Sequence, residues 1–138
     1  MYSYKHKIKY YETDKMGITH HSNYIRFMEE ARTDFLCCQG FDYAKLEEMG
    51  IISPVVSVEC KYKATTTYPD EIEIFVSVEE VKAAKIRFKY IMKKADGTLC
   101  IEAYSEHCFI TKDGKIARLK KDFPEFFEAM TKLSEMNE

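Results

Sequence analysis

The order in which helical and strand-like patterns follow one another restricts the fold of this chain more than any other feature. One long stretch of helical periodicity, from near Ser22 to Gly40, comes early, and most segments after it alternate apolar and polar residues. Strands and helices do not alternate along the chain as they do in parallel α/β folds. We therefore predict an α+β protein with an antiparallel sheet of five to six strands. The long helix is the only sizeable element able to cover the apolar face of that sheet.

The predicted long helix has one apolar face. Its apolar residues are spaced three or four positions apart, at Tyr24, Met28, Ala31 and Phe35, with Phe27 and Leu36 beside them. Ser22 or Asn23 is a suitable N-cap, and Gly40 is a suitable stop. We expect a helix of about 17 residues, about 25 Å long, that starts directly after a polar loop.

Alternation, turn residues and capping residues predict the other elements. Strands are expected over residues 2–12, 54–63, 71–79, 85–93, 99–111 and 115–119. Further helices are expected over Tyr43–Met49 and, with Asp122 as N-cap, near the C-terminus. The alternation in 99–111 is blurred, which predicts a bulge or burial on both faces. His6, inside the first predicted strand, is expected to be a packed or rim residue without a chemical role.

Composition argues against several classes of protein. At 138 residues, with 46% hydrophobic and 32% charged residues, the chain is expected to form a single domain, residues 1–138. A net charge of −2 argues against a general nucleic-acid binder. No apolar run approaches the ~20 residues of a membrane span, and the N-terminus lacks the apolar core of a signal peptide. Five cysteines without a CxxC motif predict reduced, buried thiols in a cytoplasmic protein.

The loop before the long helix carries the residues with the clearest chemical potential. Asp14 stands three residues before Gly17, which lets backbone approach a ligand closely. The backbone N–H groups at the start of the helix can hold an anionic oxygen. A carboxylate beside them can direct water at a carbonyl or attack it, although an Asp in a loop is also a common turn former. His20 and His21 are adjacent, without the spacing of a helical zinc site, so no metal is expected.

These residues also form a pattern, Asp-x-x-Gly-x-x-x-His-x-x-Tyr. It is met at Asp14, Gly17, His21 and Tyr24, followed by Arg26, Phe27, Glu29, Ala31 and Arg32. The pattern resembles that of the 4-hydroxybenzoyl-CoA thioesterase class of hot-dog-fold acyl-CoA thioesterases, and length and element order fit over nearly the whole chain. The resemblance implies a curved sheet wrapped around the long helix, in a homodimer or homotetramer. It implies hydrolysis of a coenzyme A thioester to a free acid and coenzyme A, without a metal or bound cofactor.

The resemblance also implies roles for individual residues. Asp14 would act as a general base on water or as the nucleophile, and the backbone N–H of His21 would stabilise the oxyanion. Residues of the loop, the helix and one later strand would contact the acyl-CoA substrate: Gly17, His20, Tyr24, Lys85 and Arg87. Arginine and lysine would bind the phosphates of coenzyme A.

Several residues also have simpler explanations. Tyr24 lies on the apolar stripe, where core packing explains it, and Lys85 with Arg87 fits a solvated strand face. The side chain of His21 either orients substrate or water, or serves as a capping or packing residue. In the family an Asp is frequent at the position of Glu12. This and other departures around the acyl end of the site leave the acyl group open.

Three other functions fit the same patterns. The thioester could be carried by an acyl-carrier protein rather than by coenzyme A. The curved sheet could instead cup an apolar ligand in a non-catalytic binding module, or the chain could be a structural oligomerisation domain. Turnover that depends on Asp14 separates hydrolysis from both non-catalytic functions.

Overall fold

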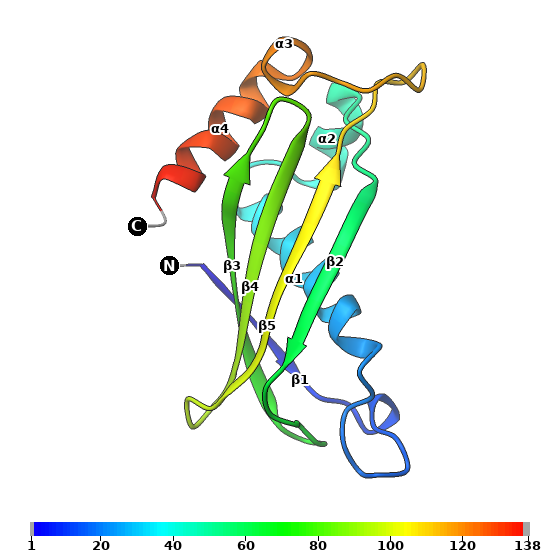
Figure 1. The fold of residues 1–138 in the computed structure, drawn as a ribbon, viewed down its shortest axis with the longest axis vertical. Coiled ribbons are helices and arrows are strands. Elements are labelled where there is room, and N and C mark those ends of the chain that lie inside the picture. Colours follow the sequence, from blue (N-terminus) through cyan, green and yellow to red (C-terminus); the bar gives the residue numbers. More distant parts are fainter. Residues whose placement is uncertain (1, 137–138) are drawn as a thin grey trace.

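The computed structural model describes residues 2–136 and contains one antiparallel sheet of five strands in the order β1-β3-β4-β5-β2 (Figure 1). The strands are β1 Ser3–Lys7, β2 Val55–Tyr62, β3 Glu71–Val81, β4 Lys85–Lys94 and β5 Leu99–Cys108. The helices are η1 Tyr10–Glu12 (a 3-10 turn), α1 Asn23–Cys38, α2 Tyr43–Met49, α3 Leu119–Asp122 and α4 Pro124–Glu135. The predicted α+β class and antiparallel sheet are confirmed.

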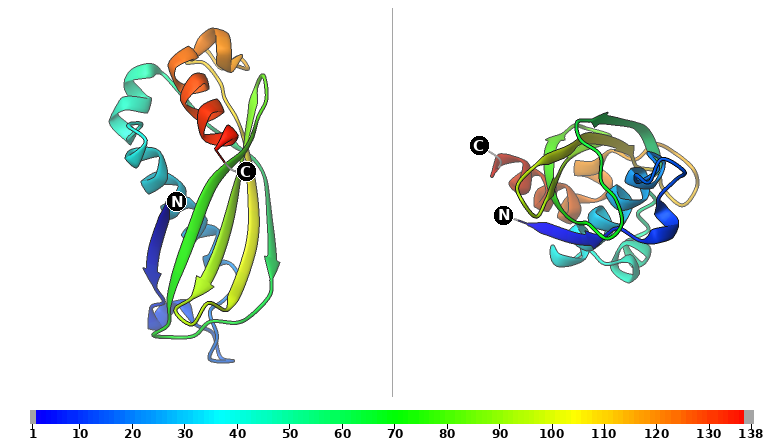
Figure 2. Two further views of the ribbon diagram at one scale, coloured as in Figure 1. Left: turned by 90° about the vertical axis from the view of Figure 1, so that its left-hand side faces the viewer. Right: turned by 90° about the horizontal axis from the view of Figure 1, so that it is seen from below.

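The sheet curves across α1 (Figure 2). Helix α4 packs against β3, toward the C-terminal end of that strand (Figure 1). The predicted stripe of α1 faces the sheet, since Tyr24, Met28, Ala31 and Phe35 are all buried. The helix ends at Cys38, two residues before Gly40, whose positive φ lets the chain turn away. Burial of an apolar face against the sheet, rather than helix propensity alone, stabilises α1.

The two central strands follow the predicted alternation. On β4 the inward residues are buried one after another, at Ile86, Phe88, Tyr90 and Met92, and those of β3 pair beside them. The register between β4 and β5 shifts at Met92 and Lys93. Because of this bulge, Cys100 and Ile101 are both buried although they are adjacent. The bulge explains the blurred alternation of the last long strand.

The first predicted strand was too long. β1 ends at Lys7, and the chain then forms the η1 turn rather than continuing to residue 12. The carboxylate of Glu12 accepts a hydrogen bond from the backbone N–H of Lys9 at 2.7 Å, which closes that turn. Tyr10 lies in this turn rather than in a strand, and its side chain is exposed.

Two predictions near the C-terminus were also wrong. Residues 115–119 form no strand but one isolated bridge between Ile110 and Ile116, and Leu119 already begins α3. Asp122 is not the N-cap of α4, because it ends α3 and its carboxylate accepts from the N–H of Arg118 at 2.8 Å. Among the cysteines, Cys100 is buried as expected, whereas Cys37 and Cys38 at the end of α1 are exposed.

Candidate functional site

The loop between η1 and α1 is a closed turn. An isolated bridge joins Thr13 to Thr19, and within it the N–H of Asp14 donates to the carbonyl of Ile18 at 2.9 Å. The N–H of Gly17 donates back to the carbonyl of Asp14 at 2.9 Å, with Gly17 at φ +78°. Since L side chains rarely adopt that φ, a glycine suits this position. The turn leaves the Asp14 side chain half-buried at its edge.

The carboxylate of Asp14 has one local hydrogen-bond donor. Its Oδ1 accepts from the backbone N–H of Met16 at 2.8 Å, the geometry of an Asx turn. An ionised carboxyl group accepts several hydrogen bonds, so one donor leaves capacity for water or a reacting group. The predicted turn-forming role of Asp14 and a catalytic role are therefore compatible.

The loop is attached to the connection between β2 and β3. The N–H of Thr19 donates to the carbonyl of Thr66 at 2.9 Å, and the two hydroxyl groups lie 2.6 Å apart. The hydroxyl of Thr67 donates to the carbonyl of Gly17 at 2.6 Å. These contacts bring residues about 50 positions apart together. The sequence pattern carries no signal for a hydroxyl pair between segments this far apart along the chain.

The start of α1 offers one free backbone donor. The N–H groups of Asn23 and Tyr24 donate to the carbonyls of His20 and His21, and that of Ser22 points at the His20 ring. Within residues 2–136, the N–H of His21 has no acceptor. Ser22 occupies the N-cap position, but its hydroxyl bonds the His20 ring nitrogen at 2.9 Å rather than the helix. The helix start is therefore left open to an outside acceptor.

The two histidine side chains lie at the surface beside the sheet edge. Their ring centroids are 4.3 Å apart, and the His21 ring meets the edge of the Tyr62 ring at 6.2 Å. Tyr62 ends β2 and is 52% exposed. The sequence assigned Tyr62 only to a strand face, so its position next to the loop is new.

Tyr24 lies in the core below this surface. It is buried, and its hydroxyl is 2.8 Å from the hydroxyl of Thr66. Burial raises the pKa of Tyr24, and hydrogen bonds from threonine hydroxyl groups partly offset that rise. Tyr24 is thus a core residue that contacts the loop through Thr66, as the packing explanation predicted.

Lys85 and Arg87 are not close to the loop within one chain. Tyr62, beside His21, pairs with Ile101, whereas Arg87 pairs with Glu106, five residues further along β5. At about 3.4 Å per residue this is roughly 17 Å. Arg87 also donates from Nε to Glu79 at 2.7 Å, and its guanidinium lies over the Tyr104 ring at 4.3 Å.

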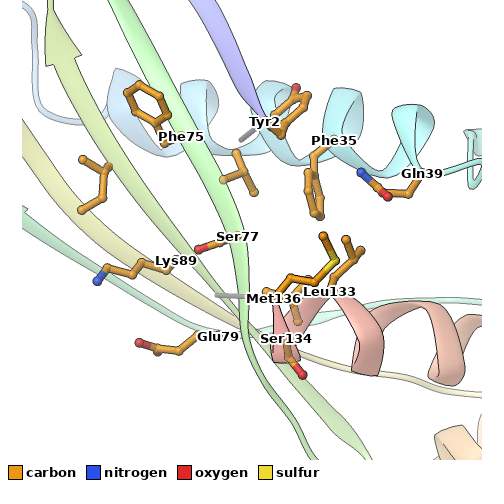
Figure 3. Close-up of a pocket in the computed structure, with 13 residues that line it drawn as sticks. Tyr2, Phe35, Gln39, Phe75, Ser77, Glu79, Lys89, Leu133, Ser134 and Met136 are labelled. Atoms are coloured by element: carbon orange, nitrogen blue, oxygen red, sulfur yellow. The ribbon is translucent and has the colours of Figure 1, made fainter. Parts of the chain in front are cut away.

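A cavity of about 760 Å³ lies elsewhere, between the second half of α1, β3 and α4 (Figure 3). Its walls carry Tyr2, Phe35, Phe75, Leu133 and Met136, with Lys89 and Glu79 at one side. None of the predicted site residues lines it. The cavity and the Asp14 loop are therefore separate features.

Residues 2–136 hold no group of three or more His, Cys, Asp or Glu side chains arranged to bind a metal ion. None of the helices described combines the length and apolar character needed to cross a bilayer.

The sequence of this chain is similar to those of several known proteins. A family model described as the Thioesterase-like superfamily matches residues 8–130. A protein of Aquifex aeolicus, named as a proposed esterase, is 39% identical over 119 residues, which are 86% of this chain and 91% of the relative. Bacillus subtilis YneP, named as a proposed acyl-CoA thioesterase, is 33% identical over 127 residues, which are 91% of this chain and 92% of the relative.

The solved structures include similar folds. The crystal structure of a DHNA-CoA thioesterase from Staphylococcus aureus aligns with a TM-score of 0.90 at 34% identity. The alignment covers 98% of this chain and 91% of that one.

Proposed function

Since this chain belongs to the Thioesterase-like superfamily and is a thioester hydrolase of the hot-dog fold, we propose that it hydrolyses acyl-CoA thioesters with Asp14 as the catalytic carboxylate. The observation that supports this most is the pairing, in one short loop, of a half-buried carboxylate with the unoccupied N–H of His21 at the start of α1. A carboxylate and an oxyanion donor are the two groups that thioester hydrolysis requires.

In the proposed reaction, the thioester carbonyl oxygen lies at the N–H of His21. Asp14 takes a proton from water while the water oxygen attacks the carbonyl carbon, or its own oxygen attacks first. The C–O double bond opens to an oxyanion, which the N–H of His21 and the partial positive charge of the helix start stabilise. When water attacks, the C–S bond then breaks, the thiolate of coenzyme A takes the proton from Asp14, and the free acid leaves. When Asp14 attacks, the C–S bond breaks to leave an anhydride between Asp14 and the acyl group. Water then hydrolyses this anhydride, which frees the acid and leaves Asp14 protonated, and the thiolate takes that proton.

The substrate proposal extends to the long coenzyme A arm. Gly17 and His20 are exposed next to Asp14 and would face the acyl end of the substrate. Lys85 is exposed about 17 Å or more along the sheet, which suits a thioester whose phosphates lie far from the reacting carbonyl. DHNA-CoA is included among the candidate substrates because of the similar Staphylococcus aureus structure.

We also propose that the active form is a homodimer or homotetramer associated through β2. This strand is an edge of the sheet, and Val56, Val58 and Tyr62 on it are 40% to 52% exposed. An exposed apolar edge with unpaired backbone groups favours pairing with another strand. Tyr62 lies beside His21, so such an interface would adjoin the site. The five free thiols are consistent with the proposed cytoplasmic location.

The first test compares wild type with Asp14→Asn on short, long and aromatic acyl-CoA esters and on an acyl-carrier-protein thioester. Asparagine retains an Oδ1 that can accept from Met16, so the loop is preserved. We expect kcat to fall at least ~100-fold. Free coenzyme A is measured by chromatography, because exposed Cys37 and Cys38 would react with thiol reagents.

The matched control is Asp96→Asn. Oδ1 of Asp96 accepts the same kind of Asx hydrogen bond, from the backbone N–H of Thr98 at 3.0 Å, in the turn between β4 and β5. Its substitution should leave kcat unchanged. Equal activity of Asp14→Asn and wild type would remove Asp14 from the reaction. Release of the acid from the carrier-protein thioester alone would change the proposed donor.

A single turnover in ¹⁸O-labelled water separates the two roles of Asp14. If Asp14 directs water, the product acid of the first turnover carries the label. If Asp14 is the nucleophile and water attacks its carboxyl carbon in the anhydride, the first product takes an unlabelled oxygen from the carboxylate and the label enters the protein. Label in the protein therefore identifies the nucleophilic route. Mass spectrometry of both acid and protein reads either outcome directly.

A further inference from the structure

We propose that His6 and Glu12 form a buried positioning pair that fixes the loop carrying Asp14 and His21. The proposal rests on the catalytic role proposed for that loop. His6 is on β1 and Glu12 ends η1, so the pair joins the sheet to the segment that leads into the loop. Neither residue touches a reacting atom. Both would act through the geometry of Asp14 and the His21 N–H.

The pair is buried and hydrogen-bonded. His6 is 6% and Glu12 7% exposed, and His6 Nε2 lies 3.0 Å from Glu12 Oε1. With Glu12 ionised, the ring nitrogen must be the donor, since a carboxylate only accepts. The same oxygen accepts from the N–H of Lys9 at 2.7 Å, and the His6 ring packs on Phe27 with centroids 4.0 Å apart. The Glu12 carboxylate is therefore held by two contacts, and Phe27 supports the ring that makes one of them.

The backbone of Glu12 holds the far end of the loop. Its carbonyl accepts from the N–H of His20 at 2.8 Å and from the side-chain amide of Asn23 at 2.9 Å. One residue thus ties β1, through its carboxylate, to the start of α1, through its carbonyl. Asp14 lies two positions after Glu12, and His21 follows His20 directly. A shift of Glu12 would therefore change the distance between the Asp14 carboxylate and the N–H of His21, the proposed oxyanion donor.

Stability alone is a poor explanation for this pair. Burying a carboxylate such as that of Glu12 carries a desolvation penalty that can exceed its attraction to a partner, and well-packed apolar residues often replace buried polar pairs without loss. A second carboxylate, Glu30, lies 3.6 Å from His6 Nδ1 but is about half exposed, and its polar contacts are with His6 and Tyr4 of β1 rather than with the loop. It provides a matched control at the same imidazole ring.

The decisive variant is the double substitution His6→Phe with Glu12→Leu. It refills the space with apolar side chains, so the fold is expected to survive, while the acceptor for Lys9 and the link from β1 to the loop are lost. We expect kcat to fall roughly 10-fold to 100-fold, as for a small misplacement of reacting groups, with KM changed less than about 2-fold. Glu30→Gln should keep the wild-type kcat and KM.

Glu12→Gln is the conservative variant. Its Oε1 can accept from both His6 and Lys9, so it should recover a kcat within about 3-fold of wild type if geometry rather than charge is what matters. A folded double variant with wild-type kcat would overturn the proposal. So would a conservative variant as slow as the double variant.

Amide hydrogen exchange provides a readout that does not need turnover. The N–H of His20 should be protected in wild type and Glu30→Gln, and should exchange at least about 10-fold faster in the double variant while the β4 amides stay unchanged. Unchanged exchange at His20 refutes the positioning role even if the protein hydrolyses no thioester. If wild type is inactive but the exchange result holds, the proposed function fails and the structural coupling stands.

Discussion

Acid should destabilise this protein through His107, which lies on β5 under α1. It is 1% exposed, and its Nε2 is 2.8 Å from the hydroxyl of Ser105. That hydroxyl is 2.7 Å from the hydroxyl of Tyr90, to which Nη1 of Arg32 donates at 3.1 Å. Burial, and secondarily the charge of Arg32, lowers the pKa of His107 from 6.5 to about 4. At neutral pH His107 is therefore a neutral member of a buried polar network.

The sign of the effect follows from the direction of this shift. Below pH 6.5 the unfolded chain binds a proton at His107 that the folded protein does not bind until about pH 4. The stabilisation is thus fully present above pH 6.5, declines as the pH falls, and is lost by about pH 4. At ~1.36 kcal/mol per pH unit, the interval corresponds to about 3 kcal/mol. That is a large part of the ~5–15 kcal/mol by which a domain is normally stable.

Urea unfolding of wild type and His107→Gln at pH 7.5, 6, 5 and 4.5, at one protein concentration, measures this effect. Glutamine keeps a group able to bond Ser105 but does not titrate in this range. Acid also weakens carboxylate contacts, but equally in both proteins, so the difference between their pH profiles isolates His107. We expect wild type to lose about 2–3 kcal/mol more than the variant between pH 7.5 and 4.5. Parallel profiles would refute the assignment of His107 as the acid-sensitive group.

Three further substitutions test the loop, the core and the edge. Gly17→Ala should destabilise by about 1 kcal/mol in urea unfolding, because alanine is strained at φ +78°, and no change would contradict a fixed turn. Phe35→Ala should lower the free energy of unfolding by about 3–5 kcal/mol and lower the calorimetric Tm, since the ring packs between Tyr2 and Phe88. A loss under about 1 kcal/mol would contradict this packing role, because neighbouring side chains would then fill the space of the ring. Val58→Lys, on the exposed β2 edge, should lower the mass seen in sedimentation velocity while the circular dichroism stays native. An unchanged mass would place the contact elsewhere.

The sequence alone determined the elements whose pattern is local and repetitive. The spacing of Tyr24, Met28, Ala31 and Phe35 predicted the buried face of α1, and alternation predicted β3 and β4. These patterns are reliable because each buried position recurs with the period of its own backbone. Where a side chain accepts a hydrogen bond from the backbone of a residue a few positions away, the prediction from the pattern was wrong. Glu12 closes a turn where a strand was expected, and Asp122 ends α3 and accepts from the N–H of Arg118 rather than starting α4.

The candidate site divides in the same way. Asp14, Gly17 and His21 were identified from a short stretch of sequence, and the structure places them in one loop. The attachment of this loop to Thr66, its proximity to Tyr62, and the link from Glu12 to His6 were not predicted. Lys85 and Arg87, predicted to contact the substrate from a later strand, lie on β4 away from the loop, and their role stays a prediction.

Only the tertiary structure decided these relationships, because they join residues whose separation along the chain bears no relation to their distance in space. A sequence pattern records which face of an element is apolar, and hydrophobic burial acts on that face as a whole. Hydrogen bonds such as that between His6 and Glu12 depend instead on the position and direction of two particular atoms. In this protein the sequence by itself determined the long helix, the central strands and the candidate loop, and only tertiary contacts such as those of Thr66 and His6 decided what holds that loop in place.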